Sequence, residues 1–242
     1  MQSLSSEQIL AVWETGREQH ELDRALTLLA AGSPELSREE LGALSIGERD
    51  ARLLRLRALV LGPRAEGFAE CPACAARLEF PVDTAAFALP RNQTAETHEI
   101  ETEGARIRFR LPTSVDLAEV VATPDPAHGL RRLVERCVIE VRGDVANHSG
   151  ELTSEIVEAL SRAMLRVDPR AEITLALECP ACGQRWQTLF DVAAFFWNEL
   201  AAQARRLLRE IDVIARAYGW SEREILNLSA RRRQSYLELV AS

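Results

Sequence analysis

Two copies of the tetrapeptide Cys-Pro-Ala-Cys, at residues 71–74 and 179–182, contain four of the five cysteines in this 242-residue chain. A thiolate pair at this spacing can present both sulfurs to one metal from a tight turn, and structural Zn²⁺ takes four such ligands in a tetrahedron. Neither pair completes such a site alone. The sequence therefore predicts one structural Zn²⁺ per chain, held by Cys71, Cys74, Cys179 and Cys182, which closes the intervening chain into a loop.

The two tetrapeptides belong to a longer internal repeat. Each follows a glutamate, Glu70 or Glu178, and each precedes an Asp-x-Ala-Ala-Phe segment, at residues 83–87 and 191–195. All matched residues are separated by the same offset of 108, so no gap is needed. The repeat predicts two related units, each a metal-binding turn followed by a strand, that face each other as in a zinc ribbon.

Three other interpretations of the cysteines remain open. The first is a redox Cys-x-x-Cys motif, which lies at the start of a helix whose N-terminus lowers a thiol pKa. Here alternating residues after each tetrapeptide, at 78–82 and 186–190, predict strands instead of helices. Structural disulfides require an oxidising compartment, and residues 1–7 do not resemble a secretion signal. Accidental spacing is the third, and the double occurrence argues against it.

The fifth cysteine, Cys137, is expected elsewhere. It lies on an apolar stripe at three- and four-residue steps that runs from Leu130 to Val141. The pattern predicts a helix with Cys137 as a small buried hydrophobic residue.

The composition disfavours nucleic-acid and membrane binding. The formal net charge is −8 with a pI near 5.2, and all 29 basic residues are arginines. Binding to phosphate backbones depends on basic surfaces, and no apolar run reaches the roughly 18–20 residues that span a bilayer. Short helices near the C-terminus with Arg231–Arg233 could form a helix-turn-helix, but a solvated helix face is the favoured interpretation in an acidic chain.

The periodicities predict an α+β fold with helical regions at both ends and a central antiparallel zinc-ribbon-like β region. The proposed divisions are a helical region at 1–63, a split ribbon at 64–190 with an inserted hairpin and helices, and a helical region at 191–242. Capping boxes are predicted at Ser37 and Ser45. The insertion contains a hairpin around Gly104, and the last region opens with a long helix that ends at Gly219.

The C-terminal region carries a resemblance to a known family. Residues 210–226 and 231–239, with the core Tyr-Gly-Trp-Ser-x-x-Glu-Ile-Leu from Tyr218, resemble a tailed-phage baseplate hub or hub-assembly family. Leu111–Ser114, and Cys-Pro-x-Cys before Asp191–Phe195, are similar to zinc-ribbon members found with phage-tail-like contractile injection systems. The resemblance implies a non-enzymatic baseplate component or assembly factor that binds baseplate, hub or tube proteins, and it carries no catalytic residues. The alternative is that the chain is a nucleic-acid-binding or regulatory protein with a zinc ribbon.

The residues themselves offer little for catalysis. Four thiolates leave zinc no open position for water, and the sequence has no phosphate-binding or dinucleotide-binding glycine motif. His20, His98, His128 and His148 fall in separate polar segments. We expect a cytoplasmic assembly protein without a small-molecule substrate.

The C-terminal helices are expected to bind a partner. Trp220 and Tyr236 are large amphipathic side chains on short helices, and such aromatic residues often dominate interfaces. Together with Arg231 and Arg232 they form the predicted partner-binding set, although both rings could instead pack against the long helix.

Overall fold

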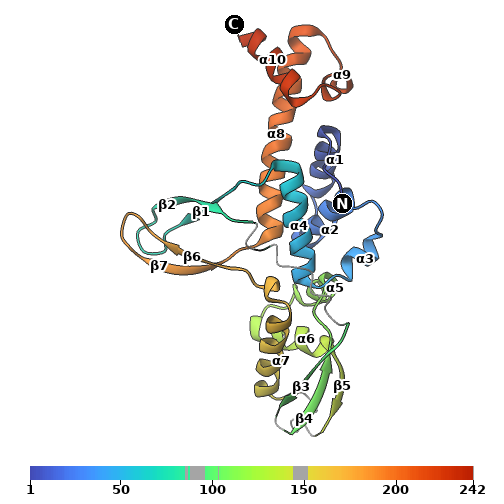
Figure 1. The fold of residues 1–242 in the computed structure, drawn as a ribbon, viewed down its shortest axis with the longest axis vertical. Coiled ribbons are helices and arrows are strands. Elements are labelled where there is room, and N and C mark those ends of the chain that lie inside the picture. The colour runs from blue at the N-terminus through green and yellow to red at the C-terminus, as the bar shows by residue number, and fades with distance from the viewer. Residues whose placement is uncertain (85–86, 88–95, 103, 144–151, 242) are drawn as a thin grey trace.

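The computed structural model describes residues 1–84, 87, 96–102, 104–143 and 152–241. Figure 1 shows three parts: a body of helices around one long helix, a β-hairpin arm that projects sideways from it, and a unit of sheet and helices at the opposite end from the C-terminus. This is the mixed helix and antiparallel sheet architecture that the sequence predicts.

The helical body combines both ends of the chain. Its elements are α1 (Ser6–Gly16), α2 (Glu21–Gly32), α3 (Arg38–Gly42), α4 (Ile46–Leu61), α8 (Val192–Tyr218), α9 (Glu222–Leu226) and α10 (Ala230–Ala241). The predicted box at Ser37 is present. Ser45 caps α4 by accepting from the Glu48 amide, but the Glu48 carboxylate pairs with Arg52 instead of completing a box.

Helix α8 supplies much of the core of the body. Its inward face packs with apolar side chains of α1, α2 and α4 in one cluster that includes Leu28, Leu56, Phe196 and Leu200, all fully buried. Gly219 ends the helix in the left-handed conformation at φ 71°, as its position predicts. The apolar spacing of the long helix predicts Leu208 and Tyr218 on this inward face, and the prediction is wrong at both, because each is 37% exposed.

The arm consists of two separate antiparallel hairpins. The first pairs β1 (Ala65–Glu70) with β2 (Arg77–Val82), and the second pairs β6 (Thr174–Glu178) with β7 (Arg185–Leu189). Each Cys-Pro-Ala-Cys tetrapeptide forms the turn between its two strands. Strand β1 was not predicted, because its alanines and glycine give almost no apolar alternation.

The third part, the sheet unit, lies in the sequence between the two hairpins. Its elements are β3 (His98–Thr102), β4 (Ala105–Phe109), α5 (Ser114–Val120), α6 (Pro126–Cys137), β5 (Val138–Arg142), α7 (Ser154–Val167) and the short 3₁₀ helix η1 (Pro169–Ala171). The hairpin around Gly104 is confirmed. Residues 144–151, whose polar composition predicts a loop that contains His148, lie outside the described residues, as do the repeat alanines at 85 and 86.

Cys137 ends α6 and is fully buried, as expected, in the core of the sheet unit. The helical stripe predicted to continue to Val141 is wrong, because Val138–Arg142 forms β5 and pairs with β4. Burial raises the pKa of the Cys137 thiol to about 11. This thiol is therefore an inert packing group.

A buried polar contact joins the sheet unit to the body. The Gly47 amide at the start of α4 donates to Asp168 Oδ2 at 2.9 Å, and a Cβ on Gly47 would meet this carboxylate at 1.8 Å. A β-bridge between Ser45 and Thr113 lies beside it. Only glycine therefore allows this approach.

The three residue ranges predicted as divisions remain a prediction. Within the described residues, no helix is long and apolar enough to cross a membrane.

Candidate metal centre

The two turns of the arm bring the four repeated cysteines together. The Cys71 and Cys182 sulfurs are 3.7 Å apart, as are those of Cys74 and Cys179, and all four sulfurs lie within 4.8 Å of one another. Each close pair therefore joins the two hairpins. These four side chains are close enough together to bind one metal ion, and they form the one such cluster found among the described residues.

The sulfur separations fit a tetrahedral site. Metal–sulfur bonds of about 2.3 Å give a regular tetrahedron with edges of about 3.8 Å, close to the two separations of 3.7 Å. An S–S bond would require about 2.05 Å. The turns also join strands instead of opening helices, so the redox-motif interpretation lacks the helix it needs.

The two turns are structural copies at the same offset of 108 residues. The Cys71 amide donates to the Ala76 carbonyl at 2.9 Å, and the Cys179 amide donates to the Gln184 carbonyl at 2.8 Å. The strand registers match as well, since Glu70 pairs with Arg77 in the first hairpin and Glu178 pairs with Arg185 in the second. The repeat seen in the sequence is thus a repeat of backbone geometry.

The thiols influence one another strongly. Burial raises the pKa of Cys71, but amides of Ala73 and Cys74 and the nearby sulfurs outweigh it and lower that pKa to about 7. The Gln184 amide lowers the pKa of Cys182, but the neighbouring sulfurs and burial raise it to about 12. A bound cation would remove this conflict, because it deprotonates each thiol that coordinates it.

The arm has few other contacts that hold its hairpins together. Its apolar cluster contains Leu78 with Cys71 and Cys179, and Ala76, Phe80 and Trp186 pack partly buried against it. Cys71 and Cys179 are buried, whereas Cys74 and Cys182 are exposed. The cysteine cluster is therefore the main inward-facing feature that the two hairpins share.

One position of the repeat differs in backbone strain. The residue after each second cysteine is left-handed: Ala75 has φ 57° and Gly183 has φ 73°. Left-handed geometry costs a non-glycine residue roughly 1–2 kcal/mol. A Cβ at Gly183 would meet nothing within 4 Å, so alanine there would cause this backbone strain but no steric clash.

We expect Ala75→Gly to tighten metal binding and Gly183→Ala to weaken it, each by roughly 1 kcal/mol or about fivefold. Competition with a chelator measures both changes. Ala181→Gly, in the same turn as Gly183, is the control for a general effect of glycine. Equal shifts in the same direction for Ala75→Gly and Gly183→Ala would contradict the structural equivalence of the two turns.

Arg57 joins the arm to the body at its base. Its guanidinium makes two hydrogen bonds to the Glu199 carboxylate, at 2.8 and 2.6 Å, and one to the Gly62 carbonyl at 2.6 Å. Gly62 precedes the first hairpin, and Glu199 lies on α8 soon after the second. The side chain of Arg57 is 3% exposed, so this contact is a buried clasp that the sequence analysis missed.

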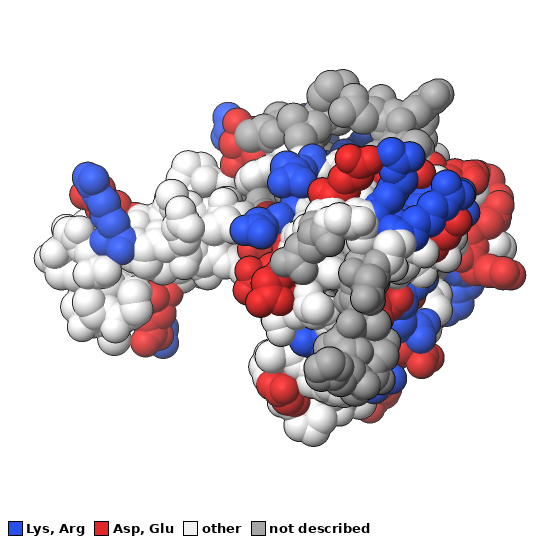
Figure 2. Space-filling model, turned by 90° about the horizontal axis from the view of Figure 1, so that it is seen from below, with Lys and Arg blue, Asp and Glu red and all other residues white. Residues whose placement is uncertain are grey.

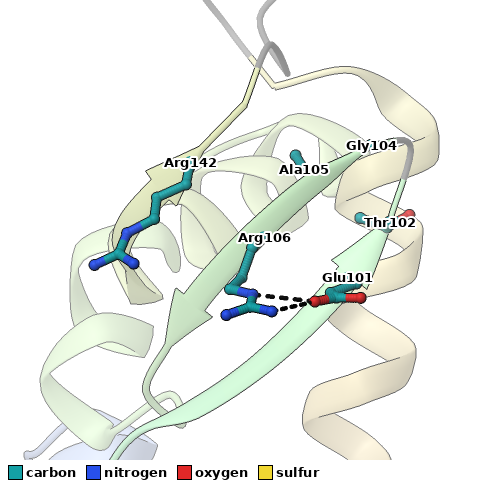
Figure 3. A pocket seen from close by; sticks show the side chains of 6 residues that line it. All are labelled: Glu101, Thr102, Gly104, Ala105, Arg106 and Arg142. Atoms are coloured by element: carbon teal, nitrogen blue, oxygen red, sulfur yellow. Dashed lines mark hydrogen bonds and ion pairs between the residues drawn. The ribbon is translucent and has the colours of Figure 1, made fainter.

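A concave surface lies at the edge of the sheet unit, and its charged residues are engaged in ion pairs. The hollow has a volume of about 480 Å³, and Figure 3 shows three of the side chains that line it, Glu101, Arg106 and Arg142. Arg106 donates to Glu101 at 2.6 Å, and Arg142 pairs with Glu140 at 2.8 Å. The described lining residues include no histidine, cysteine or serine, and both guanidinium groups already have carboxylate partners.

A family model described as T4 bacteriophage base plate protein matches residues 3–197. The chain belongs to this family. The matched range contains both hairpins and all four clustered cysteines, and it ends in the first turns of α8. The comparisons with curated proteins and with solved structures give no match.

The base plate family confirms the resemblance stated from the sequence. Part of that resemblance rested on residues 210–239, which lie outside the matched range, whereas Leu111–Ser114 and Asp191–Phe195 lie inside it. The family supports a structural or assembly role and interaction with other baseplate proteins.

Of the four residues predicted to bind a partner, Arg231, Arg232 and Tyr236 lie on α10, and Trp220 lies between α8 and α9. Trp220 and Tyr236 are partly buried and form an aromatic cluster with Tyr218, with ring centroids 4.9–5.4 Å apart. Arg231 and Arg232 are exposed. Their role in binding remains a prediction.

Sequence reasoning missed the arginine that anchors α10. Arg233 is 3% exposed and donates to Glu210 on α8, at 3.0 Å, and to the Leu228 carbonyl at 2.7 Å. The run of three arginines does not itself indicate that Arg233 is buried while Arg231 and Arg232 are exposed. The helical spacing does offer a signal for this burial, since Arg233 falls three residues before the partly buried Tyr236.

Proposed function

We propose that this chain is a non-enzymatic structural or assembly protein of a phage baseplate or a phage-tail-like contractile injection system. One structural Zn²⁺ would be held by Cys71, Cys74, Cys179 and Cys182 in a split zinc ribbon. The family match over residues 3–197 is the observation that carries this proposal. Its partners would be baseplate, hub or tube proteins.

The donor set is one that structural zinc sites use. Tetrahedral sites with four thiolates take Zn²⁺ or iron, and a saturated four-thiolate site leaves no position for a substrate. The ion would therefore act on architecture: it would fix the two hairpins to each other and present the arm as one rigid projection.

The charge distribution argues against the nucleic-acid alternative. On the sheet unit, the outer face carries the cross-strand pairs Glu99–Arg108 and Glu101–Arg106, so opposite charges alternate. Figure 2, which views the molecule from the end that carries the sheet unit, shows blue and red residues interspersed on the visible face. No long basic stripe is formed there to follow a phosphate backbone.

Reconstitution tests the proposal. The chain would be mixed with individually purified sheath, tube, hub and spike proteins of the same phage or injection system, and binding would be measured at low and physiological salt. We expect a stable complex with at least one of them, and no salt-sensitive binding to a DNA duplex. Binding to the duplex alone, with a steep salt dependence, would support the regulatory alternative and contradict the assembly role.

The same assay tests the C-terminal binding set, which we propose to include Trp220, Arg231, Arg232 and Tyr236. Deleting residues 219–242 also removes the fully buried Ile225 and the Arg233 contacts, so a surface variant is cleaner. Arg231→Glu/Arg232→Glu is expected to weaken the complex about tenfold, with Arg205→Glu/Arg209→Glu on exposed positions of α8 as the matched control. Equal affinity for both double variants would contradict this part of the proposal.

A further inference from the structure

The first hairpin of the arm exposes an aromatic side chain that its own fold does not use. Phe68 on β1 is 71% exposed. The alternate residues Ala65 and Gly67 are buried on the inner face, so Phe68 points outward from the arm. The hairpin thus leaves a large apolar side chain in water, where it contributes little to stability.

Acidic side chains surround this ring. Glu79 lies directly across from Phe68 on β2, and Glu66 and Glu70 occupy the adjacent outward positions on β1. All three are exposed, and none forms an ion pair with another described residue, although the exposed Arg77 lies across from Glu70 on the same face. Phe68, Glu66, Glu70 and Glu79 therefore form one acidic aromatic patch on the outer face of the first hairpin.

The second hairpin provides an internal comparison. At the offset of 108 residues, Phe68 corresponds to Ala176, Glu66 to Thr174, and Glu79 to Gln187. The backbone register is the same in both hairpins. A hairpin of this kind therefore forms without the aromatic ring and without two of the three carboxylates, so the acidic aromatic patch has no role in forming the fold.

We propose that the acidic aromatic patch docks the arm onto another baseplate protein, one whose surface has an apolar pocket for Phe68 with arginine or lysine side chains around it. This inference rests on the proposed function and names the chemistry of its partner. The patch combines a central aromatic anchor with an unpaired charged rim, which is the arrangement of an interface hot spot. Charge complementarity selects a basic protein surface.

The position of the patch suits this role. Figure 1 shows the arm extending away from the body, and Figure 2 shows from below that the arm projects beyond it. A partner could therefore contact the outer face of the arm without approaching the sheet unit. A second copy presents the same carboxylates, so patch-to-patch pairing would be repelled.

Two variants convert the patch into what the second hairpin carries. Phe68→Ala removes the ring, and Glu66→Thr/Glu79→Gln removes two carboxylates. The controls are Leu59→Ala, an apolar side chain on α4 that is 51% exposed, and Glu155→Thr/Glu158→Gln on exposed positions of α7. Each full-length variant is tested against the individually purified baseplate, hub and tube proteins, and its metal content is measured to show that the arm is intact.

We expect Phe68→Ala to weaken the complex about 30-fold while Leu59→Ala leaves it unchanged. Glu66→Thr/Glu79→Gln should slow association about tenfold at low salt and less at high salt, because it removes electrostatic steering. The Glu155/Glu158 control should show neither effect.

Three results would overturn the inference. If Phe68→Ala binds a baseplate protein as tightly as the unaltered chain, the patch is not the contact, although the proposed function stands. If the unaltered chain self-associates and Phe68→Ala abolishes this, the occupant is a second copy. If the unaltered chain binds none of the purified proteins, the inference and the proposed function fail together.

Discussion

Cys179→Ser is expected to release the metal and separate the two hairpins of the arm while the body and the sheet unit stay folded. Structural zinc contributes on the order of 10 kcal/mol to the folding of small domains, and the arm has only a small apolar cluster of its own. The body and the sheet unit have separate cores. Loss of one metal ligand should therefore destabilise the arm but not the body or the sheet unit.

Hydrogen exchange measures this localisation. Amide protection in β1, β2, β6 and β7 should fall at least about 100-fold, and protection in α2 and α8 should change little. Cys137→Ser is the matched control, because it alters a cysteine outside the cluster and should retain the metal. Wild-type protection and one bound metal in Cys179→Ser would contradict the shared site.

Arg57→Ala is expected to destabilise the protein by about 2–4 kcal/mol, because removing one partner of a fully buried pair costs about 3–5 kcal/mol and the Glu199 side chain is 25% exposed. The change leaves Glu199 without its two hydrogen bonds and the Gly62 carbonyl without one. For a chain of this length the melting temperature should fall by roughly 4–16 °C.

Arg57→Lys should recover part of this stability, because lysine retains the charge but cannot make the paired contact. Arg205→Ala, at an exposed position on α8, is the control and should change the melting temperature little. A drop no larger than that of the control would show that the clasp does not hold the base of the arm.

The sequence predicted the cysteine cluster because its signal is local and repeated. A Cys-x-x-Cys turn has a restricted geometry, and the constant offset of 108 residues implied two equivalent turns. The long helix and Gly219 were predicted for similar reasons, since apolar spacing and a helix stop lie within one segment.

Strands β1 and β5 were missed because tertiary contacts, not local pattern, determine them. Strand β1 alternates alanine and glycine with larger residues and receives its partner from β2. The repeat held a usable signal, since the alternation of Ile173, Leu175 and Leu177 predicts a strand before the second turn and the repeat implies an equivalent strand before the first. Val138 to Val141 fit both a helical stripe and a strand, and pairing with β4 decides between them.

Contacts between distant residues were beyond the sequence analysis. The Arg57–Glu199 pair joins residues 142 positions apart, and neither residue belongs to a recognisable motif. Helical spacing could have indicated that Arg233 is buried, but nothing in the sequence indicated Glu210 as its partner. The outward direction of Phe68 likewise depends on the register of β1 with β2.

The most direct test of the account is the metal content and sulfur coordination of the purified protein. We expect one zinc per chain, with X-ray absorption showing four sulfur ligands at about 2.3 Å and no loss of zinc in Cys137→Ser. Two zincs per chain, iron in place of zinc, or a metal-free protein with a disulfide between Cys71 and Cys74 would contradict a single zinc shared by the two hairpins.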